Sequence, residues 1–269
     1  MGAGIAHAFC VAGTVVVIVE QNEQAAEAAR GRVIAALDRT IAKGGTSESL
    51  DVLSSRLTTT TDYSHLAPCG LVVEAVPEDF DLKSTALRAV EDVVDDAAWL
   101  ATNTSSLSIG DLAAALQRPE RFCGLHFFNP VPASALIEVV LGPATSAELK
   151  RAAQEWAVAL GKTPVVVKDA PGFASSRLGV AIALEAMRMM EEGVASPEDI
   201  DAAMELGYKH SVGPLRTTDI VGLDVRLGIA EYLASTLGER FEPPRILREK
   251  VERGELGRKS GQGFFTWDD

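Results

Sequence analysis

Hydrophobic and polar positions follow two different patterns along this chain of 269 residues. Between residues 71 and 168, short apolar runs rich in β-branched side chains are separated by stretches whose apolar residues recur at helical spacing. The apolar runs are LVVEAV at 71–76, WLATN at 99–103, LIEVVL at 136–141 and TPVVVK at 163–168. Strands that alternate with helices predict a parallel α/β sheet covered by helices on both faces.

The pattern changes after Lys168. DAPGF at 169–173 is typical of a turn, and almost everything beyond it has helical periodicity. Ser196, followed by a proline, predicts the start of one of these helices. The sequence therefore predicts two domains: an α/β domain over residues 1–168 and an all-α C-terminal domain over residues 169–269.

The first residues predict a helix, a turn at Gly13, a buried strand and then Glu20. This is the second half of a Rossmann-type dinucleotide-binding unit, in which a Gly-rich turn after a strand binds the pyrophosphate and a later acid binds the ribose. Gly2 and Gly4 stand where that turn is expected to end, and Glu20 comes 18 residues after Gly2. We therefore expect a mostly parallel Rossmann-type sheet whose first strand is missing from the chain, because it would precede Met1.

Composition narrows the possible functions. The formal net charge of −13 argues against a nucleic-acid binder, which would need a basic face. No apolar run approaches the roughly 18 residues that a membrane helix needs, so we expect no membrane span. Cys10, Cys69 and Cys123 stand singly, with neither metal-ligand spacing nor a disulfide framework. We expect reduced thiols in the cytoplasm and no metal site.

The segment GLHFFNP at 124–130 carries a histidine at the end of an expected strand, where open α/β sheets place their chemistry. His126 can exchange a proton near neutral pH, and a nearby carboxylate would fix its tautomer and stabilise its charged form. Glu138 is a candidate, because a carboxylate in the apolar run LIEVV is costly to bury without a partner. The alternative is a core histidine packed among Phe127 and Phe128.

With NTSS at 103–106, GLHFFNP, Glu138, DAPGF and GRKSGQGFF at 257–265 in this order, the chain resembles the L-3-hydroxyacyl-CoA dehydrogenases over nearly its whole length. The resemblance implies reversible, NAD-dependent oxidation of an L-3-hydroxyacyl-CoA to the 3-ketoacyl-CoA by a homodimer. It assigns His126 as the general base and Glu138 as its paired carboxylate. Related sugar-acid dehydrogenases share the architecture but tend to replace the double phenylalanine.

The resemblance also assigns two residues to the substrate. Ser105 matches a serine that binds the substrate oxygen, and a neutral donor suits a developing ketone oxygen. Its alternative role is to cap a helix near Ile109. Asn129, in the histidine turn, is a further candidate for substrate binding, although it and Asn103 could equally be turn formers. Ser176 stands where relatives carry an asparagine that assists the substrate and the histidine, so we expect water to extend its reach and activity or acyl preference to change.

Five further residues match positions near the cofactor. Glu20 matches the acid that binds the adenosine ribose, and its charge would repel a 2′-phosphate, so NAD is expected rather than NADP. Asn103 matches a residue at the nicotinamide side. Glu78 and Lys83 match a pair near the cofactor, and Lys259 matches a C-terminal lysine that approaches it. For these last three, a solvated surface charge is the alternative.

Two other functions stay open at this point. A sugar-acid or other 3-hydroxy-acid dehydrogenase on the same scaffold would act without CoA. A catalytically impaired, truncated homologue would have lost cofactor binding with its first strand and glycines. We expect about a dozen further residues upstream of Met1 to complete the dinucleotide-binding unit.

Overall fold

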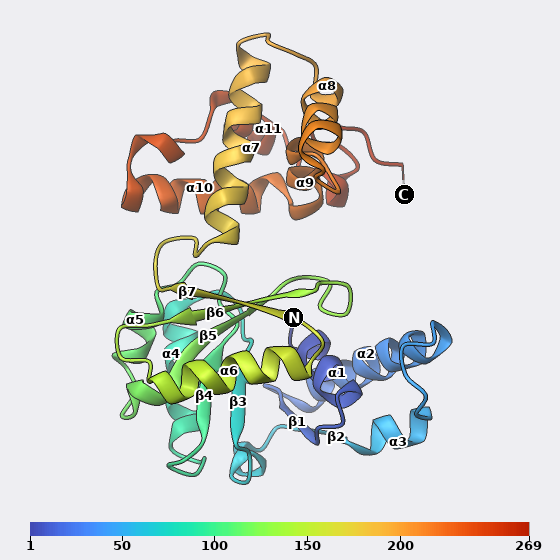
Figure 1. Ribbon diagram of the computed structural model, residues 1–269, viewed down its shortest axis with the longest axis vertical. Coiled ribbons are helices and arrows are strands. Elements are labelled where there is room, and N and C mark those ends of the chain that lie inside the picture. The colour runs from blue at the N-terminus through green and yellow to red at the C-terminus, as the bar shows by residue number, and fades with distance from the viewer. Residues whose placement is uncertain (269) are drawn as a thin grey trace. The chain divides into compact units, whose positions relative to one another are not determined.

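The chain divides into two compact units in the computed structural model, which describes residues 1–268. Unit 1 comprises Met1–Asp169 and unit 2 begins at Ala170. Every named strand lies in unit 1, whereas the described part of unit 2 contains helices and turns (Figure 1). Among residues 1–268, every helix is too short or too polar to span a bilayer.

Unit 1 alternates strands with helices, as its sequence pattern predicts. Its strands are β1 (Val16–Val19), β2 (Leu57–Thr60), β3 (Leu71–Glu74), β4 (Trp99–Thr102), β5 (Phe122–Phe127), β6 (Leu136–Leu141) and β7 (Thr163–Lys168). Its helices are α1 (Gly2–Val11), α2 (Glu23–Ala42), α3 (Leu50–Ser55), α4 (Phe80–Glu91), α5 (Ile109–Ala113) and α6 (Ala147–Ala159).

The strands form two sheets. One has the order β3-β4-β5-β6-β7 and is parallel except for the antiparallel pair β5–β6, while β1 and β2 form a separate parallel pair. The mostly parallel Rossmann-type α/β fold is thereby confirmed. The strand at Val16–Val19 was expected to be buried but is only half-buried, because among the described residues it pairs with β2 alone.

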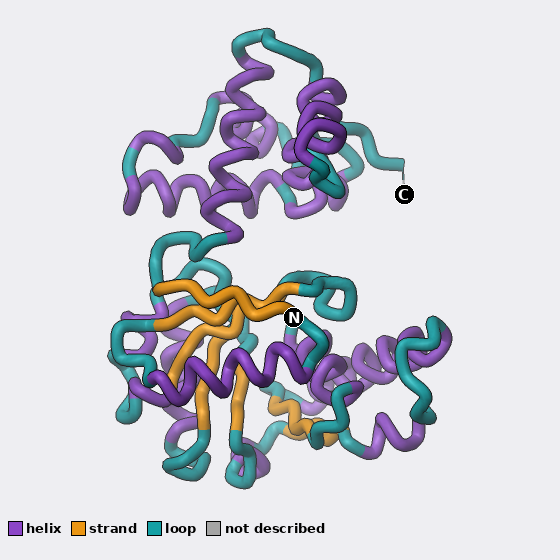
Figure 2. The backbone as a smooth tube through the Cα atoms, in the orientation of Figure 1, coloured by secondary structure: helices purple, strands orange, loops and turns teal. Residues whose placement is uncertain are grey.

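Helices cover both faces of the five-stranded sheet (Figures 1 and 2). Apolar residues of α6 pack against alternate residues of β5 and β6. The other face holds α5, where Gly124 leaves no room for a side chain: a Cβ there would lie 2.8 Å from Val140 and 3.0 Å from Ile109. Because side chains alternate along a strand, His126 and Glu138 share this second face with Gly124 and Val140.

Local capping fixes where several helices begin. The side chain before the helix accepts a hydrogen bond from a backbone N–H three residues on, which satisfies a group that the helix leaves unpaired. Such caps are Asn22 for α2, Ser49 for α3, Asp79 for α4, Ser108 for α5 and Ser146 for α6. The Asp79 cap, whose side chain accepts a hydrogen bond from the N–H of Leu82, sets the start of α4 at Phe80.

Unit 2 is built from helices around its own apolar core. The helices are α7 (Ser175–Glu191), α8 (Pro197–Ala202), α9 (Pro214–Val221), α10 (Leu223–Leu237) and α11 (Arg245–Glu252). Ser196 caps α8, as its sequence predicts. The buried Asp219 accepts hydrogen bonds from the N–H groups of Phe264 and Phe265 and from the Trp267 indole, and so ties the C-terminal segment to α9.

Candidate active site

A histidine and a glutamate face each other across β5 and β6. The antiparallel register pairs His126 with Glu138, and Nδ1 of the imidazole lies 2.8 Å from Oε2 of the carboxylate. The two residues are 7% and 1% exposed. Phe128 packs beside the imidazole with ring centroids 4.4 Å apart, whereas Phe127 faces the opposite side of the sheet. The carboxylate therefore holds the imidazole in one orientation, with Nδ1 engaged.

Asn103, directly after β4, links this strand to β5, the strand that carries His126. Its side-chain oxygen accepts a hydrogen bond of 2.9 Å from the N–H of Phe127, the residue after His126. Its own N–H donates to the carbonyl of Glu74 at the end of β3. The expected nicotinamide-side residue therefore lies beside the His126–Glu138 pair and helps to set the position of its strand.

Glu78 accepts several hydrogen bonds from the loop after β4 that carries Ser105 and Ser106. Its Oε1 accepts hydrogen bonds from the Thr104 hydroxyl at 2.6 Å, the Ser105 N–H at 2.9 Å and the Ser106 N–H at 3.0 Å. The Ser105 hydroxyl donates to the same oxygen at 3.2 Å. Burial alone would raise the pKa of Glu78, but the Thr104 hydroxyl and the Lys83 charge lower it overall. Ser108, rather than Ser105, caps α5.

Lys83 is buried instead of solvated, because its ammonium has an acidic partner that the sequence analysis missed. Its residue is 1% exposed, and Nζ lies 2.9 Å and 3.2 Å from the two carboxylate oxygens of Glu74. Thr102 donates to Glu74 at 2.7 Å, and Glu78 lies 3.5 Å from the ammonium. The signal was present: Glu74 interrupts the apolar run LVVEAV just as Glu138 interrupts LIEVV.

The residues expected at the dinucleotide fit that group. No side chain caps the N-terminus of α1, so its first N–H groups are available to an anion such as a pyrophosphate. Gly2 and Gly4 lie in its first turn, and a Cβ at Gly4 would come within 3.0 Å of Val131. Glu20 follows β1 and is half-buried. Among the described residues, no hydrogen-bond donor engages its carboxylate, which is therefore available to ribose hydroxyls.

The remaining expected residues lie elsewhere. Asn129 is exposed in the turn after β5, where a cis peptide bond joins it to Pro130. Ser176 is half-buried in the first turn of α7. Lys259 forms an ion pair with Asp224, with the ammonium 2.5 Å and 2.7 Å from the two carboxylate oxygens. Ser176 and Lys259 thus belong to unit 2, whereas all the other expected residues belong to unit 1.

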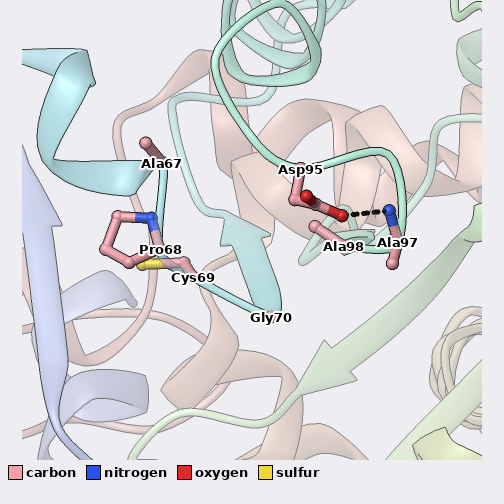
Figure 3. Close-up of a pocket in the computed structure, with 7 residues that line it drawn as sticks. All are labelled: Ala67, Pro68, Cys69, Gly70, Asp95, Ala97 and Ala98. Atoms are coloured by element: carbon pink, nitrogen blue, oxygen red, sulfur yellow. Dashed lines mark hydrogen bonds between the residues drawn. The ribbon is translucent and has the colours of Figure 1, made fainter.

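A hollow of about 340 Å³ in unit 1 lies away from these residues (Figure 3). Its lining comes from the segments just before β3 and β4, including Cys69, Gly70 and Asp95. The candidate site is built instead from residues at and beyond the carboxyl ends of these strands. The hollow therefore lies at the amino-terminal ends of β3 and β4, away from the end of the sheet where α/β folds place their chemistry.

A dinucleotide-binding α/β unit with a buried His–Glu pair, followed by a helical unit, defines a two-domain NAD-dependent dehydrogenase. Comparison with known proteins specifies the family. The chain belongs to the 3-hydroxyacyl-CoA dehydrogenases: residues 1–170 match the NAD binding domain of that family and residues 172–267 match its C-terminal domain.

Individual relatives agree with this assignment. The chain is 40% identical to a probable 3-hydroxybutyryl-CoA dehydrogenase of Deinococcus radiodurans, over 99% of this chain and 96% of the relative. It is 38% identical to a 3-hydroxyadipyl-CoA dehydrogenase of Escherichia coli, over 99% of this chain and 57% of the relative. The crystal structure of (S)-3-hydroxybutyryl-CoA dehydrogenase from Ralstonia eutropha superposes with a TM-score of 0.95 at 39% identity, covering 100% of this chain and 96% of that one.

These comparisons correct one expectation. The match to the NAD binding domain begins at residue 1, so it does not support the expected N-terminal truncation. The interpretation of the chain as an impaired, truncated homologue depended on that truncation and loses its motive.

Proposed function

We propose that this protein oxidises an L-3-hydroxyacyl-CoA reversibly to the 3-ketoacyl-CoA, with NAD as the hydride acceptor. The observation that carries the proposal is the buried His126–Glu138 pair, with 2.8 Å between Nδ1 and Oε2, at the end of β5. The family match supports it, as do relatives that are named 3-hydroxybutyryl-CoA dehydrogenases.

In the proposed reaction, His126 is the general base. Its Nδ1 donates to Glu138, so Nε2 is the ring nitrogen that takes the proton from the 3-hydroxyl group. Proton transfer leaves a positive charge on the imidazole, and the adjacent Glu138 carboxylate stabilises that charge. In the reverse direction the imidazolium returns the proton to the developing alkoxide.

Most of the residues that would hold NAD belong to unit 1, as the His126–Glu138 pair does. The first turn of α1, with Gly2 and Gly4, would bind the pyrophosphate, and Glu20 would bind the adenosine ribose. When bound, NAD supplies the hydride acceptor for carbon 3. We assign Asn103, Glu78 and Lys83 of unit 1 to positioning on the cofactor side. Lys259 of unit 2 is assigned to the same role.

Three residues are proposed to act on the substrate. Ser105 donates a hydrogen bond to the substrate oxygen, and its 3.2 Å bond to Glu78 is long enough to be exchanged for this stronger one. Asn129 lies in the histidine turn and binds the substrate on that side. Ser176 replaces a longer asparagine, and we propose that water extends its reach.

The proposal includes a homodimer in the cytoplasm. Three free cysteines, of which Cys10 and Cys123 are buried, agree with a reducing compartment. A closed twofold dimer is the commonest oligomer, and unit 2 exposes the apolar side chains that such an interface would use.

The test is the oxidation of NADH, followed at 340 nm, with acetoacetyl-CoA as substrate. We expect turnover by the wild type and a loss of about 10²- to 10⁴-fold for His126→Ala, the range typical of a general base. His65→Ala is the matched control, because His65 is exposed in unit 1. Equal rates in wild type and His126→Ala would exclude His126 as the base.

The same assay with free acetoacetate distinguishes the alternative. A 3-hydroxy-acid dehydrogenase that needs no CoA would reduce acetoacetate as well as acetoacetyl-CoA. We expect a strong preference for the thioester.

A further inference from the structure

Lys162, directly before β7, is a buried cation that is held by backbone carbonyls. The residue is 8% exposed, and its ammonium donates hydrogen bonds to the carbonyl oxygen of Val131, at 2.7 Å, and to that of Ser134. Burial lowers the pKa of this ammonium, and no carboxylate of the described residues offsets that effect. The buried Lys83, by contrast, is paired with Glu74. A buried charge without an acidic partner is costly, which indicates that the two carbonyl contacts serve more than stability.

The two carbonyls belong to the turn between β5 and β6. This turn carries Asn129, the proposed substrate-side residue, and the N–H groups of Ala133 and Ser134 both donate to the carbonyl oxygen of Pro130. The later carbonyls of such a turn lack partners within it, and an ammonium with three donors can satisfy several of them. Lys162 therefore sets the position of the turn that carries Asn129.

The same turn packs against the first turn of α1. Val131 is 2% exposed and lies in one core cluster with Ile5 of α1. A Cβ at Gly4 would lie 3.0 Å from Cγ2 and 3.1 Å from Cβ of Val131, so a methyl group there would require Val131 to move by a few tenths of an ångström. Gly4 and Val131 thus form a close contact between α1 and the turn that Lys162 holds.

The charge of Lys162 also reaches α1. His7, one helical turn after Gly4, is 4% exposed; burial lowers its pKa, and the charges of Arg39 and Lys162 lower it further. Lys162 immediately precedes Thr163, whose register partner is the first residue of β6, at the edge of the sheet where β5 ends. All these residues belong to unit 1. The ammonium, the turn and the start of α1 therefore meet at the edge of the sheet where NAD is expected.

We propose that Lys162 is a positioning residue of the NAD site, which holds Val131 against Gly4 and so makes the first turn of α1 and the turn that carries Asn129 one rigid support. This inference deepens the proposed function and rests on its assignment of the pyrophosphate to the first turn of α1. Lys162 acts through Val131 and does not have to touch the cofactor. Cofactor binding and the placement of Asn129 are coupled, because Val131 cannot move at one without disturbing the other.

The experiment is a double-mutant cycle on Gly4 and Lys162, with the Kd of NADH measured by calorimetric titration. Gly4→Ala should raise the Kd by at least about 10-fold, because the added methyl group pushes the first turn of α1 away from a Val131 that is held in place. In the Lys162→Met background the same change should raise the Kd by less than about 3-fold, because Val131 can then move. Lys162→Met alone should raise the Kd by about 5-fold, because the first turn loses its support.

Hydrogen exchange without cofactor separates positioning from a general loss of stability. The N–H of Ile5 bonds to the carbonyl of Met1 in the first turn of α1, and in Lys162→Met it should exchange at least about 10-fold faster. The amides of α4 should exchange at the wild-type rate. Lys168→Met is the matched control, because Lys168 is an exposed lysine at the other end of β7, and it should change neither the Kd nor the exchange.

Three outcomes would overturn the proposal: wild-type affinity for NADH in Gly4→Ala, an equal cost of Gly4→Ala in both backgrounds, or faster exchange throughout unit 1 in Lys162→Met. If Lys162→Met does not fold, Lys162→Gln takes its place in both measurements, because the amide keeps a donor without the reach to both carbonyls. If the wild type does not bind NADH, the cofactor assignment fails first. Exchange at Ile5 then decides about Lys162: faster exchange in the variant supports the proposed contact, and unchanged exchange overturns it.

Discussion

Carboxylates interrupt apolar strands twice in unit 1, at Glu74 in β3 and at Glu138 in β6. Each is at most 5% exposed and each has a nitrogen partner, the Lys83 ammonium for Glu74 and the His126 imidazole for Glu138. Burial is tolerated because the partner compensates the charge. The two pairs differ in chemistry, because the imidazole has a second ring nitrogen that can accept a proton from a substrate, whereas the lysine ammonium can only donate hydrogen bonds.

We predict that Glu74→Gln destabilises the protein by about 3 kcal/mol or more, because it leaves the buried Lys83 without its closest carboxylate. Asp96→Asn is the matched control: Asp96 is paired with Arg118 at 2.7 Å, but its side chain is fully exposed, so its loss should have little effect. The measurement is the free energy of unfolding from urea titration of both variants. Similar losses in the two variants would show that burial does not decide the strength of these pairs.

At the scale of elements, carboxylates accept hydrogen bonds from both ends of the loop between β4 and α5. Glu78 holds the N–H groups of Ser105 and Ser106. At the other end, Asp169 accepts hydrogen bonds from the Ser108 hydroxyl and from the N–H of Gly110, at 2.9 Å and 2.8 Å. The loop that carries the proposed substrate serine therefore depends on two residues far from it in the sequence.

For Glu78 we predict a pH-dependent contribution to stability. The pKa of Glu78 is lowered in the folded state. At pH values between this lowered pKa and the usual value of 4.5, the folded protein therefore binds fewer protons at Glu78 than the unfolded chain does. The free energy of unfolding therefore rises with pH between these two pKa values. The contribution of Glu78 is complete above its usual pKa of 4.5 and is lost as pH falls through the lowered pKa. The difference in urea midpoint between wild type and Glu78→Gln should be present at pH 7 and shrink below about pH 4.

Glu78→Gln keeps a side-chain oxygen and removes the charge, so the pH series isolates the carboxylate. Hydrogen exchange at Ser105 and Ser106 should quicken in the variant at pH 7. A difference in midpoint that is independent of pH would assign the effect to altered packing.

Sequence patterns predicted the elements of unit 1 more fully than their contacts. The apolar runs at 136–141 and 163–168 coincide with β6 and β7, because their pattern is local. The antiparallel pairing of β5 with β6 is set by contacts between distant segments, and it alone places Glu138 opposite His126. The partners of Lys83 and Ser105 were missed for the same reason: hydrogen bonds that join the ends of different strands leave no periodic signal.

On the scale of the whole molecule, each unit has its own apolar core, but their surfaces differ. Eight large apolar side chains are exposed between residues 170 and 268, against seven in the longer unit 1. Leu206 and Tyr208, near the end of the π-helical turn at Ala203–Gly207, are the most exposed of the eight, at 73% and 76%. Apolar side chains so exposed and so close together are typical of a surface that another protein covers.

We propose that this surface forms the dimer, and we predict that Leu206→Asp combined with Tyr208→Asp separates the subunits, because two carboxylates would be buried against an apolar partner surface. Light scattering after gel filtration should give the wild type twice the chain mass of 28.5 kDa and the double variant a single chain mass. Val158→Asp, at a residue 63% exposed on α6 of unit 1, should remain a dimer. Because the His126–Glu138 pair lies wholly in unit 1, the monomeric variant should keep the pair intact. A double variant that stays dimeric would move the interface to another face of the molecule.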